Sequence, residues 1–254
     1  MSDRDPYSRV DYRRLIAWPQ RIEREAPFLA SVLGAPPGRV FDLGCGTGEH
    51  ARFLADRGFE VVAIDASESM IQKATEEPLP EGLSFVLGDL GGVGDLAEGS
   101  FDGAICLGNT LPHVREPGQL ERALLGLRQR LRPGAPVCLQ LLNYEGFHKR
   151  GERALPVNIR PGEQAGEEVV FLRLMTEQEA GTWCFNPTTL RYRPGSEPPL
   201  EVVSSKNVLL RGWLLSDLRP RLEGAGFGRL ELFGGMEFQP FDAATSADLV
   251  IVAR

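Results

Sequence analysis

Three glycines at alternate positions stand between an apolar run and a stretch with helical character. Gly44, Gly46 and Gly48 follow the run 40–43, and without side chains they let the backbone turn sharply and approach a ligand. A helix that begins after such a turn offers free backbone N–H groups. The spacing G-x-G-x-G differs from the G-x-G-x-x-G of dinucleotide-binding folds, and Asp42 precedes it by two residues. That carboxylate would repel a pyrophosphate but attract a sulfonium or ammonium group, which favours S-adenosylmethionine over NAD.

Two further acids stand where the next apolar runs end. Asp65 closes V-V-A-I-D, and Asp89 follows the run that ends at Leu87. Asp65 can accept both ribose hydroxyls, a feature that S-adenosylmethionine and NAD share, so it does not distinguish them. Asp89 is a candidate for the adenine amino group or, equally, for a helix cap, and Met70 for the adenine face or the core. The prediction depends on the three acids together, at three successive strand ends.

Apolar runs alternate with helix-like stretches over the first half of the chain. The runs expected to be strands are 40–43, 61–64, 83–87, 101–107 and 137–142. Helix-like stretches lie between them, near 50–55, 67–74 and 119–131. This alternation predicts parallel βαβ units and therefore an α/β, doubly wound sheet with helices on both faces.

The alternation stops after Asn143. Residues 144–210 hold short β-rich runs between turn residues and no convincing amphipathic helix, which indicates a small antiparallel insertion. We therefore divide the chain into an N-terminal helical cover (1–37), a core (38–143 and 211–254) and an insertion (144–210) over the acceptor site.

The motifs D-L-G-C-G-T-G, V-V-A-I-D-A-S-E-S-M and G-D-L share their order and spacing with a known family. Over about residues 38–143 the chain resembles the class I S-adenosylmethionine-dependent methyltransferases. The resemblance implies a Rossmann-like, mostly parallel seven-stranded sheet with a small antiparallel β insertion after the fifth strand. It also implies the cofactor-binding residues, which in this sequence are Gly44, Cys45, Gly46, Asp65, Ala66, Met70, Asp89 and Leu90.

A narrower resemblance is carried by L-G-N within F-D-G-A-I-C-L-G-N-T-L-P-H-V and by the pair Asn143-Tyr144. These residues are similar to the glycine/sarcosine N-methyltransferase branch, in which a β-rich insertion also follows. The branch implies that Leu107 contacts the cofactor and that Asn109 faces the methyl acceptor. It also implies an aromatic–arginine helix over the cofactor, whose arginine either pairs with the methionine carboxylate or lies on a solvated face. The corresponding residues here are Tyr12, Trp18 and Arg21.

One position departs from that branch. Its members carry an arginine directly before the Asn-Tyr pair to hold the glycine carboxylate, whereas this chain has Leu142. Burying an unpaired carboxylate is very costly, so glycine is the acceptor only if another arginine, such as one in 148–153, replaces it. We expect Asn109 and the insertion to shape the acceptor pocket, with apolar or cation–π surface from four aromatic residues. These are Tyr144, Trp183, Phe185 and Tyr192.

His113, six residues after Leu107, is the candidate base or acceptor contact, unless it only packs locally. Methyl transfer is a direct displacement to which a protein contributes mainly alignment, worth on the order of 7–11 kcal/mol. An amine acceptor needs only to arrive neutral, whereas a hydroxyl needs a stronger base. We predict methylation of a small-molecule amine, with a hydroxylated small molecule as the alternative acceptor. An NAD-linked oxidoreductase and a non-catalytic binding protein are the remaining alternatives.

Composition limits the partners and the location. The formal charge of −7 disfavours nucleic acid, and no apolar run approaches the roughly 20 residues of a membrane span. The N-terminus lacks the apolar core of a signal peptide. The four cysteines form no C-x-x-C pair and the three histidines show no zinc-like spacing. We therefore expect a cytoplasmic protein with no metal, whose oligomeric state the sequence leaves open.

Overall fold

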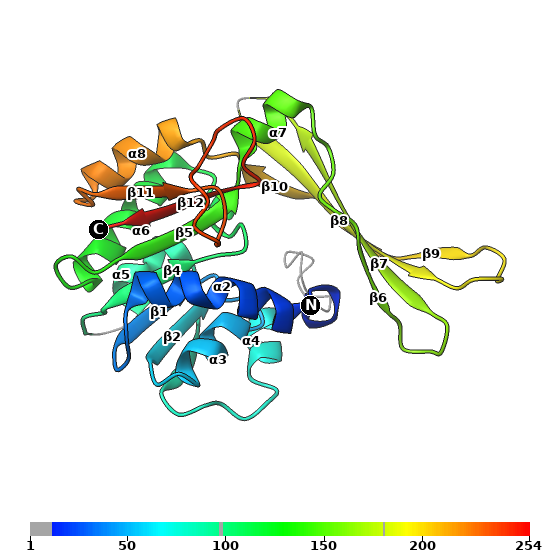
Figure 1. Ribbon diagram of the computed structural model, residues 1–254, viewed down its shortest axis with the longest axis horizontal. Coiled ribbons are helices and arrows are strands. Elements are labelled where there is room, and N and C mark those ends of the chain that lie inside the picture. The colour runs from blue at the N-terminus through cyan, green and yellow to red at the C-terminus, as the bar shows by residue number, and fades with distance from the viewer. Residues whose placement is uncertain (1–11, 97–98, 180) are drawn as a thin grey trace.

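The computed structural model describes residues 12–96, 99–179 and 181–254. The strands of its larger sheet are β1 Arg39–Leu43, β2 Glu60–Asp65, β3 Leu83–Leu87, β4 Gly103–Cys106, β5 Val137–Leu142, β11 Leu230–Phe233 and β12 Asp248–Ala253. They form a seven-stranded sheet in the order β11-β12-β5-β4-β1-β2-β3 (Figure 1). The pairs from β5 to β3 are parallel, whereas β12 is antiparallel to both of its neighbours. The predicted doubly wound, mostly parallel sheet is confirmed.

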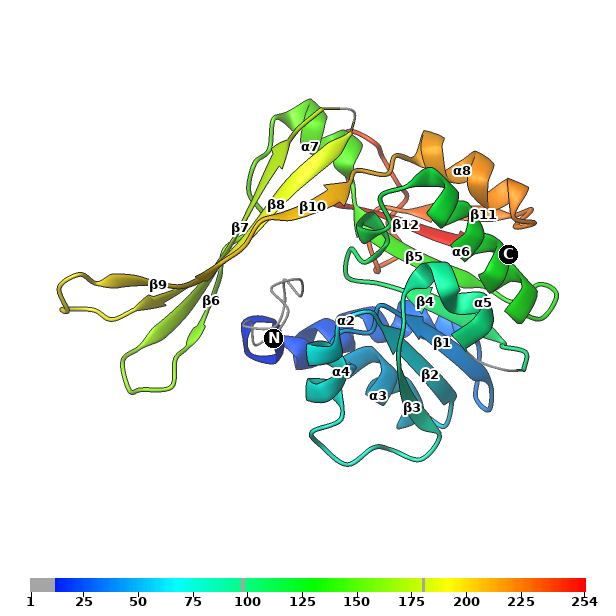
Figure 2. The ribbon, with the colours of Figure 1, turned by 180° about the vertical axis from the view of Figure 1, so that it is seen from behind.

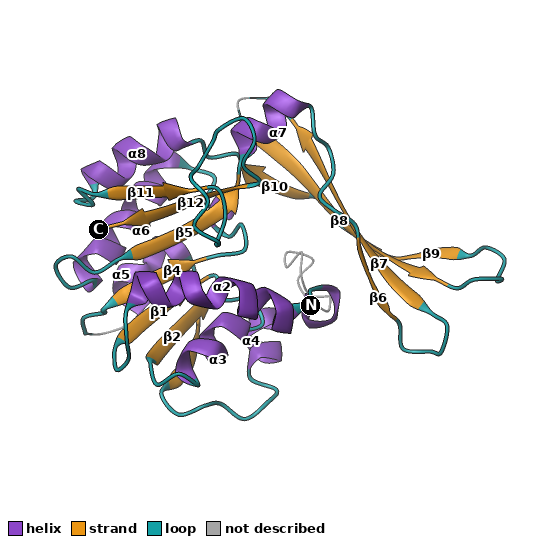
Figure 3. Ribbon diagram, in the orientation of Figure 1, coloured by secondary structure: helices purple, strands orange, loops and turns teal. Residues whose placement is uncertain are grey.

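Helices cover both faces of this sheet (Figure 3). The helical segments are α1 Tyr12–Leu15, α2 Trp18–Leu33, α3 Glu49–Ala55, α4 Glu68–Ala74, η1 Leu90–Gly92, α5 Val93–Leu96, η2 Leu111–His113, α6 Pro117–Arg130, α7 Tyr144–Arg150 and α8 Leu215–Gly224. Side chains of α2 and α3 pack in one apolar cluster, and those of α5, α6 and α8 in another. Burial on both faces explains why the strands read as continuous apolar runs. In the described ranges, no helix combines the length and the apolar character of a membrane span.

The segment between β5 and α8 forms a second, antiparallel sheet that projects from the core as a twisted arm (Figures 1 and 2). Its strands are β6 Asn158–Pro161, β7 Glu168–Glu177, β8 Thr182–Tyr192, β9 Leu200–Ser205 and β10 Val208–Arg211. The root of the arm is packed firmly, since Met175, Trp183 and Leu210 belong to the apolar cluster of the core. The segment does contain a helix, because α7 precedes the arm. Asn143 caps it by accepting the N–H of Gly146 at 3.1 Å.

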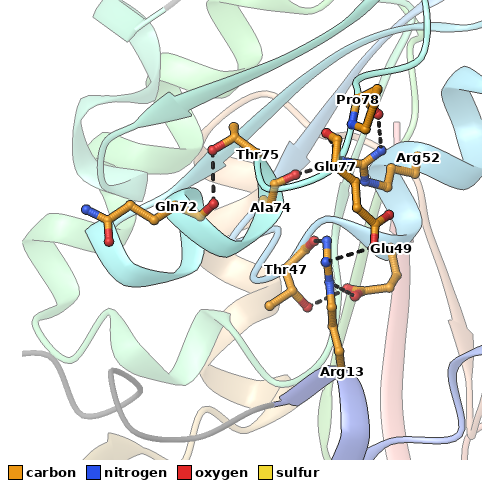
Figure 4. A network of polar contacts seen from close by, with 9 residues as sticks. All are labelled: Arg13, Thr47, Glu49, Arg52, Gln72, Ala74, Thr75, Glu77 and Pro78. Atoms are coloured by element: carbon orange, nitrogen blue, oxygen red, sulfur yellow. Dashed lines mark hydrogen bonds and ion pairs between the residues drawn. The ribbon is translucent and has the colours of Figure 1, made fainter.

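The short helix α1 is joined to the glycine loop through Arg13 (Figure 4). Its Nε donates to Glu49 Oε1 at 3.0 Å and its Nη2 donates to the carbonyl of Thr47 at 3.2 Å. Thr47 Oγ1 in turn donates to Glu49 Oε2 at 2.6 Å. The guanidinium therefore ties α1 to the residues that begin α3.

The same helix is also joined to the arm. Leu15 is buried against Phe171 of β7, with Val169 packed beside them. Asn158 of β6 donates its Nδ2 to the carbonyl of Leu15 at 3.2 Å. One turn of helix thus contacts both the cofactor-binding edge of the core and the projecting sheet.

Candidate active site

The three glycines of the loop after β1 all have positive φ, but their surroundings differ. Their φ angles are 72° at Gly44, 57° at Gly46 and 86° at Gly48. A Cβ on Gly44 would lie 2.0 Å from Cγ2 of Thr110, in the loop after β4, and one on Gly48 would lie 2.4 Å from the ring of Phe85. A Cβ on Gly46 would meet nothing within 4 Å. Gly44 and Gly48 therefore allow close packing, while the backbone at Gly46 borders open space that a ligand can approach.

Asp65 lies at the carboxyl end of β2, as predicted. Its Oδ2 accepts the N–H of Gly46 at 2.8 Å, and its Oδ1 accepts the N–H of Ser67 at 2.8 Å. Ser67 caps α4 by accepting the N–H of Met70 at 3.1 Å, and the Met70 side chain is buried. Because each carboxylate oxygen has two lone pairs, the same group can hold the glycine loop and also accept ribose hydroxyls.

Asp42 of β1 is a buried carboxyl group, with 3% of its surface exposed. Within the described ranges its Oδ2 makes no hydrogen bond. Burial raises the pKa of Asp42 to about 8, and the carboxylates of Asp65 and Glu49 act in the same direction. A buried acceptor without a donor is costly, and a cationic ligand beside the loop would lower that cost. These residues therefore fit S-adenosylmethionine, and they do not fit a ligand that places a pyrophosphate on the loop.

Four further predicted cofactor residues lie along the same edge. The N–H of Cys45 donates to a carbonyl of β2 at 3.0 Å, and burial raises the pKa of its thiol, which stays protonated. Ala66 stands in the turn between β2 and α4. Asp89 accepts a backbone N–H of η1 at 3.1 Å and so caps that segment, which begins with Leu90. The cap is observed, whereas contact of Asp89 with adenine stays a prediction.

The first turn of α2 places Trp18 and Arg21 at the end of β4. Nη2 of Arg21 lies 4.0 Å from the point that a Cβ on Gly108 would occupy. The guanidinium carbon lies 5.0 Å from the centroid of the Trp18 ring. Leu107, next to Gly108 in sequence, is buried. The structure thus brings three of the predicted residues together, while the side chain of Tyr12 lies outside the described part of the chain.

Asn109 connects the ends of β4 and β5. It has a left-handed backbone, with φ of 67°, and its Oδ1 accepts the N–H of Leu142 at 3.0 Å. Its Nδ2 donates to the hydroxyl of Tyr144 at 3.0 Å. Burial raises the pKa of Tyr144 above its usual range, so the hydroxyl is neutral. Asn109 is half-buried at the acceptor edge, and its role toward the acceptor stays a prediction.

His113 ends η2, four residues after Asn109. Its side chain has an exposed edge, yet the protein packed around the ring desolvates it and lowers the pKa of His113 to about 4. The imidazole is therefore neutral at pH 7. It can accept a hydrogen bond, but it is a weak base.

The basic segment 148–153 has partners of its own. Arg150 pairs with Glu152 at 2.8 Å, and Arg153 donates to a threonine hydroxyl of β7 at 3.2 Å. Leu142, where the branch has its arginine, is paired across the strands with Asp248. These contacts give no support to the segment as a replacement for that arginine.

The four aromatic residues expected in one acceptor pocket are not together. Tyr144 and Trp183 pack at the root of the arm, with ring centroids 5.6 Å apart, and Phe185 packs against the same apolar cluster. Tyr192 ends β8, nine residues after Trp183, which places it roughly 30 Å away along the strand. The prediction that Tyr192 shares a pocket with the others is therefore wrong, because the strand is longer than the broken apolar pattern indicates.

Asp248 and Gln140 are residues of this edge that sequence reasoning missed. The N–H of Gly108 donates to Oε1 of Gln140 at 2.6 Å, and the Gln140 side chain hydrogen-bonds Asp248. Asp248 begins β12, and its antiparallel pairing with β5 brings it opposite Leu142. Burial raises the pKa of Asp248 to about 6, although Gln140 and Arg21 act against the rise. An acid that opens an apolar run was the available sequence signal.

We expect Asp248→Asn to be more stable than the parent protein above pH 6 and equally stable below about pH 4. A carboxyl group whose pKa is raised by folding binds more protons in the folded state, so stability falls as pH rises between the two values. The rise from 3.8 to about 6 corresponds to about 3 kcal/mol at neutral pH, which sets the upper limit of the gain. Urea unfolding at both ends of this range measures the difference. The exposed Glu81→Gln is the matched control, and an Asp248→Asn protein less stable than its parent at neutral pH would contradict the assignment.

Comparison with known proteins identifies the family. Residues 40–134 match the family described as "Methyltransferase domain". The chain is similar to the glycine/sarcosine N-methyltransferase of Halorhodospira halochloris, with 32% identity over 142 residues, which are 54% of this chain and 52% of that protein. The chain thus spans about half the length of the curated relatives it matches.

Two solved structures cover nearly the whole chain. The CcbJ methyltransferase from Streptomyces caelestis is 25% identical, with a TM-score of 0.74 over 100% of this chain and 99% of that one. CalS10 from Micromonospora echinaspora, an amino pentose methyltransferase solved with S-adenosylmethionine bound, has a TM-score of 0.69 at 20% identity and covers 96% and 94% of the two chains. The second likeness concerns the fold. The chain belongs to the class I S-adenosylmethionine-dependent methyltransferases.

Proposed function

We propose that the protein transfers the methyl group of S-adenosylmethionine to an amine nitrogen of a small molecule. The observation that carries the cofactor assignment is Asp42, a buried carboxyl group with an orphaned oxygen beside the open backbone at Gly46. The relatives support the amine, because the curated one is named an N-methyltransferase and CalS10 is described as an amino pentose methyltransferase.

Each residue of the cofactor edge has a distinct task in this proposal. S-adenosylmethionine supplies, when bound, a methyl group already activated on a sulfonium. Asp65 would hold the ribose, Asp42 would balance the positive charge, and Arg21 would pair with the methionine carboxylate. Leu107 would contact the cofactor, and Asn109 would face the acceptor. The remaining contribution of the protein is alignment of the two reactants.

His113 favours nitrogen over oxygen as the acceptor atom. A hydroxyl must lose its proton to a good general base as it attacks, and an imidazole with a pKa of about 4 is a poor one. A neutral amine already has a free lone pair and needs only an acceptor for the proton that it later releases. A weak, neutral acceptor at position 113 suits that requirement.

The edge near Leu142 favours an amine that carries no carboxylate beside its nitrogen. Leu142 offers no partner to such a group, and Asp248, opposite to it in the sheet, would repel one. We therefore propose amines other than α-amino acids as the acceptor class, with amino sugars as one example.

A panel of acceptors tests the proposed function directly. Purified protein is incubated with S-adenosylmethionine and with glycine, sarcosine, simple amines, amino sugars or phenols, and S-adenosylhomocysteine is measured. We expect formation above the acceptor-free rate with one or more non-carboxylate amines. Turnover with phenols and not with amines would overturn the nitrogen assignment.

Asp65→Ala should weaken binding of S-adenosylmethionine by more than about tenfold, because hydrogen bonds to a charged group contribute about 1.5–3 kcal/mol. Titration calorimetry measures the affinity. Asp65→Asn preserves the size of the side chain and guards against loss of folding, and the exposed Asp56→Ala is the matched control. An Asp65→Ala protein with the parent's affinity would refute the cofactor assignment.

Binding of S-adenosylmethionine at pH 7 should release protons from Asp42. With a pKa of about 8 this carboxyl group is mostly protonated before binding, and a cationic ligand nearby lowers that pKa. Calorimetry in buffers of different ionisation enthalpy counts the protons released, which we expect to approach one per site. Asp42→Asn should abolish the release, and proton uptake by the parent protein would contradict the assignment.

A further inference from the structure

The contacts of Arg21 lead from the cofactor edge to a buried pair behind it. Nε of Arg21 donates to Oε1 of Glu25 at 2.9 Å, one turn further along α2. The other carboxylate oxygen, Oε2, lies 2.7 Å from Nε2 of His50, the second residue of α3. Glu25 and His50 are buried, with exposed fractions of 5% and 7%. A continuous chain of polar contacts therefore runs from the helix after the glycine loop to Arg21.

Trp18 encloses this chain. Its ring stands edge-to-face with the ring of His50, with centroids 5.6 Å apart and an interplanar angle of 87°. The Arg21 guanidinium carbon lies 5.0 Å from the centre of the same ring. Trp18 therefore limits the movement of the arginine on one side while Glu25 fixes its Nε.

Glu25 is negatively charged in this position. Burial would raise the pKa of Glu25, but the hydrogen bond with His50 and the charge of Arg21 outweigh it and lower that pKa below its usual value. Asp248 of β12 is a second carboxyl group in the field of Arg21. With Nε engaged by Glu25, the guanidinium has its terminal nitrogens to offer, and Nη2 is the one beside Gly108.

We propose that Glu25, held by His50, is a positioning residue that presents Arg21 to the carboxylate of the cofactor's methionine portion. The inference rests on the proposed function, because it requires S-adenosylmethionine as the ligand. An arginine side chain loses much rotamer freedom when it binds a partner. Fixing it beforehand removes part of that cost from the binding step. His50 adds register, because it connects Glu25 to the helix that the glycine loop begins.

Two ligands separate positioning from simple packing of α2 on α3. S-adenosylhomocysteine carries the methionine-derived carboxylate, and 5′-methylthioadenosine lacks the whole amino-acid portion while keeping the adenosine. We expect Glu25→Gln to weaken binding of S-adenosylhomocysteine about tenfold and to change binding of 5′-methylthioadenosine less than about twofold. A residue with a merely structural role would weaken both ligands alike.

The measurement is titration calorimetry of the full chain with each ligand. Glu23→Gln, on the exposed face of the same helix, is the matched control and should leave both affinities unchanged. If Glu25→Gln does not fold, His50→Gln tests the chain from its other end, with the same selective loss expected at smaller size.

The outcomes distinguish the two proposals. A parent protein that binds neither ligand refutes the proposed function. A parent protein that prefers S-adenosylhomocysteine, with the same preference in Glu25→Gln, refutes the positioning role alone. Equal weakening of both ligands also refutes it, because the pair then only packs the two helices.

Discussion

The approach of Gly44 to Thr110 is the constraint on which the rest of the site depends. Oγ1 of Thr110 lies 3.3 Å from the carbonyl of Gly44 and 2.9 Å from that of Leu107, so one side chain joins the loops after β1 and β4. Any side chain at position 44 would displace this contact. Gly108 and Asn109 stand between Leu107 and Thr110, so their contacts with α2 and β5 depend on the same fixed loop.

Behind that edge the fold buries three carboxyl groups with different compensation. Glu25 has two partners, and the pKa of Glu25 is lowered. Asp248 has Gln140 and a more distant arginine, and the pKa of Asp248 is raised to about 6. Asp42 has an oxygen without a partner in the described ranges, and the pKa of Asp42 is raised to about 8. The series shows where the protein satisfies its own charges and where a cationic ligand would complete them.

Features close to strand ends in the sequence were predictable, and features that depend on long-range pairing were not. Asp42 and Asp65 follow from local patterns, because a glycine turn or an apolar run places each at the carboxyl edge. Asp248 reaches that edge only through antiparallel pairing with a strand that ends about a hundred residues earlier. Gln140 lies inside an apolar strand, where its hydrogen bond to the next loop leaves no pattern. Tyr192 was misplaced because strand length depends on partners that the sequence does not reveal.

The arm is attached to the core at two separate places. Its root is packed into the apolar cluster through Trp183, and further along it contacts α1, which Arg13 joins to Glu49 at the glycine loop. A sheet held only at its root would be a lever that swings on one hinge. With the second attachment the arm, α1 and the core form a closed frame. Displacement of the arm must therefore break the contacts of α1 with β6 and β7 or pull on the residues that follow the loop, so the projecting sheet and the nucleotide edge are mechanically one assembly.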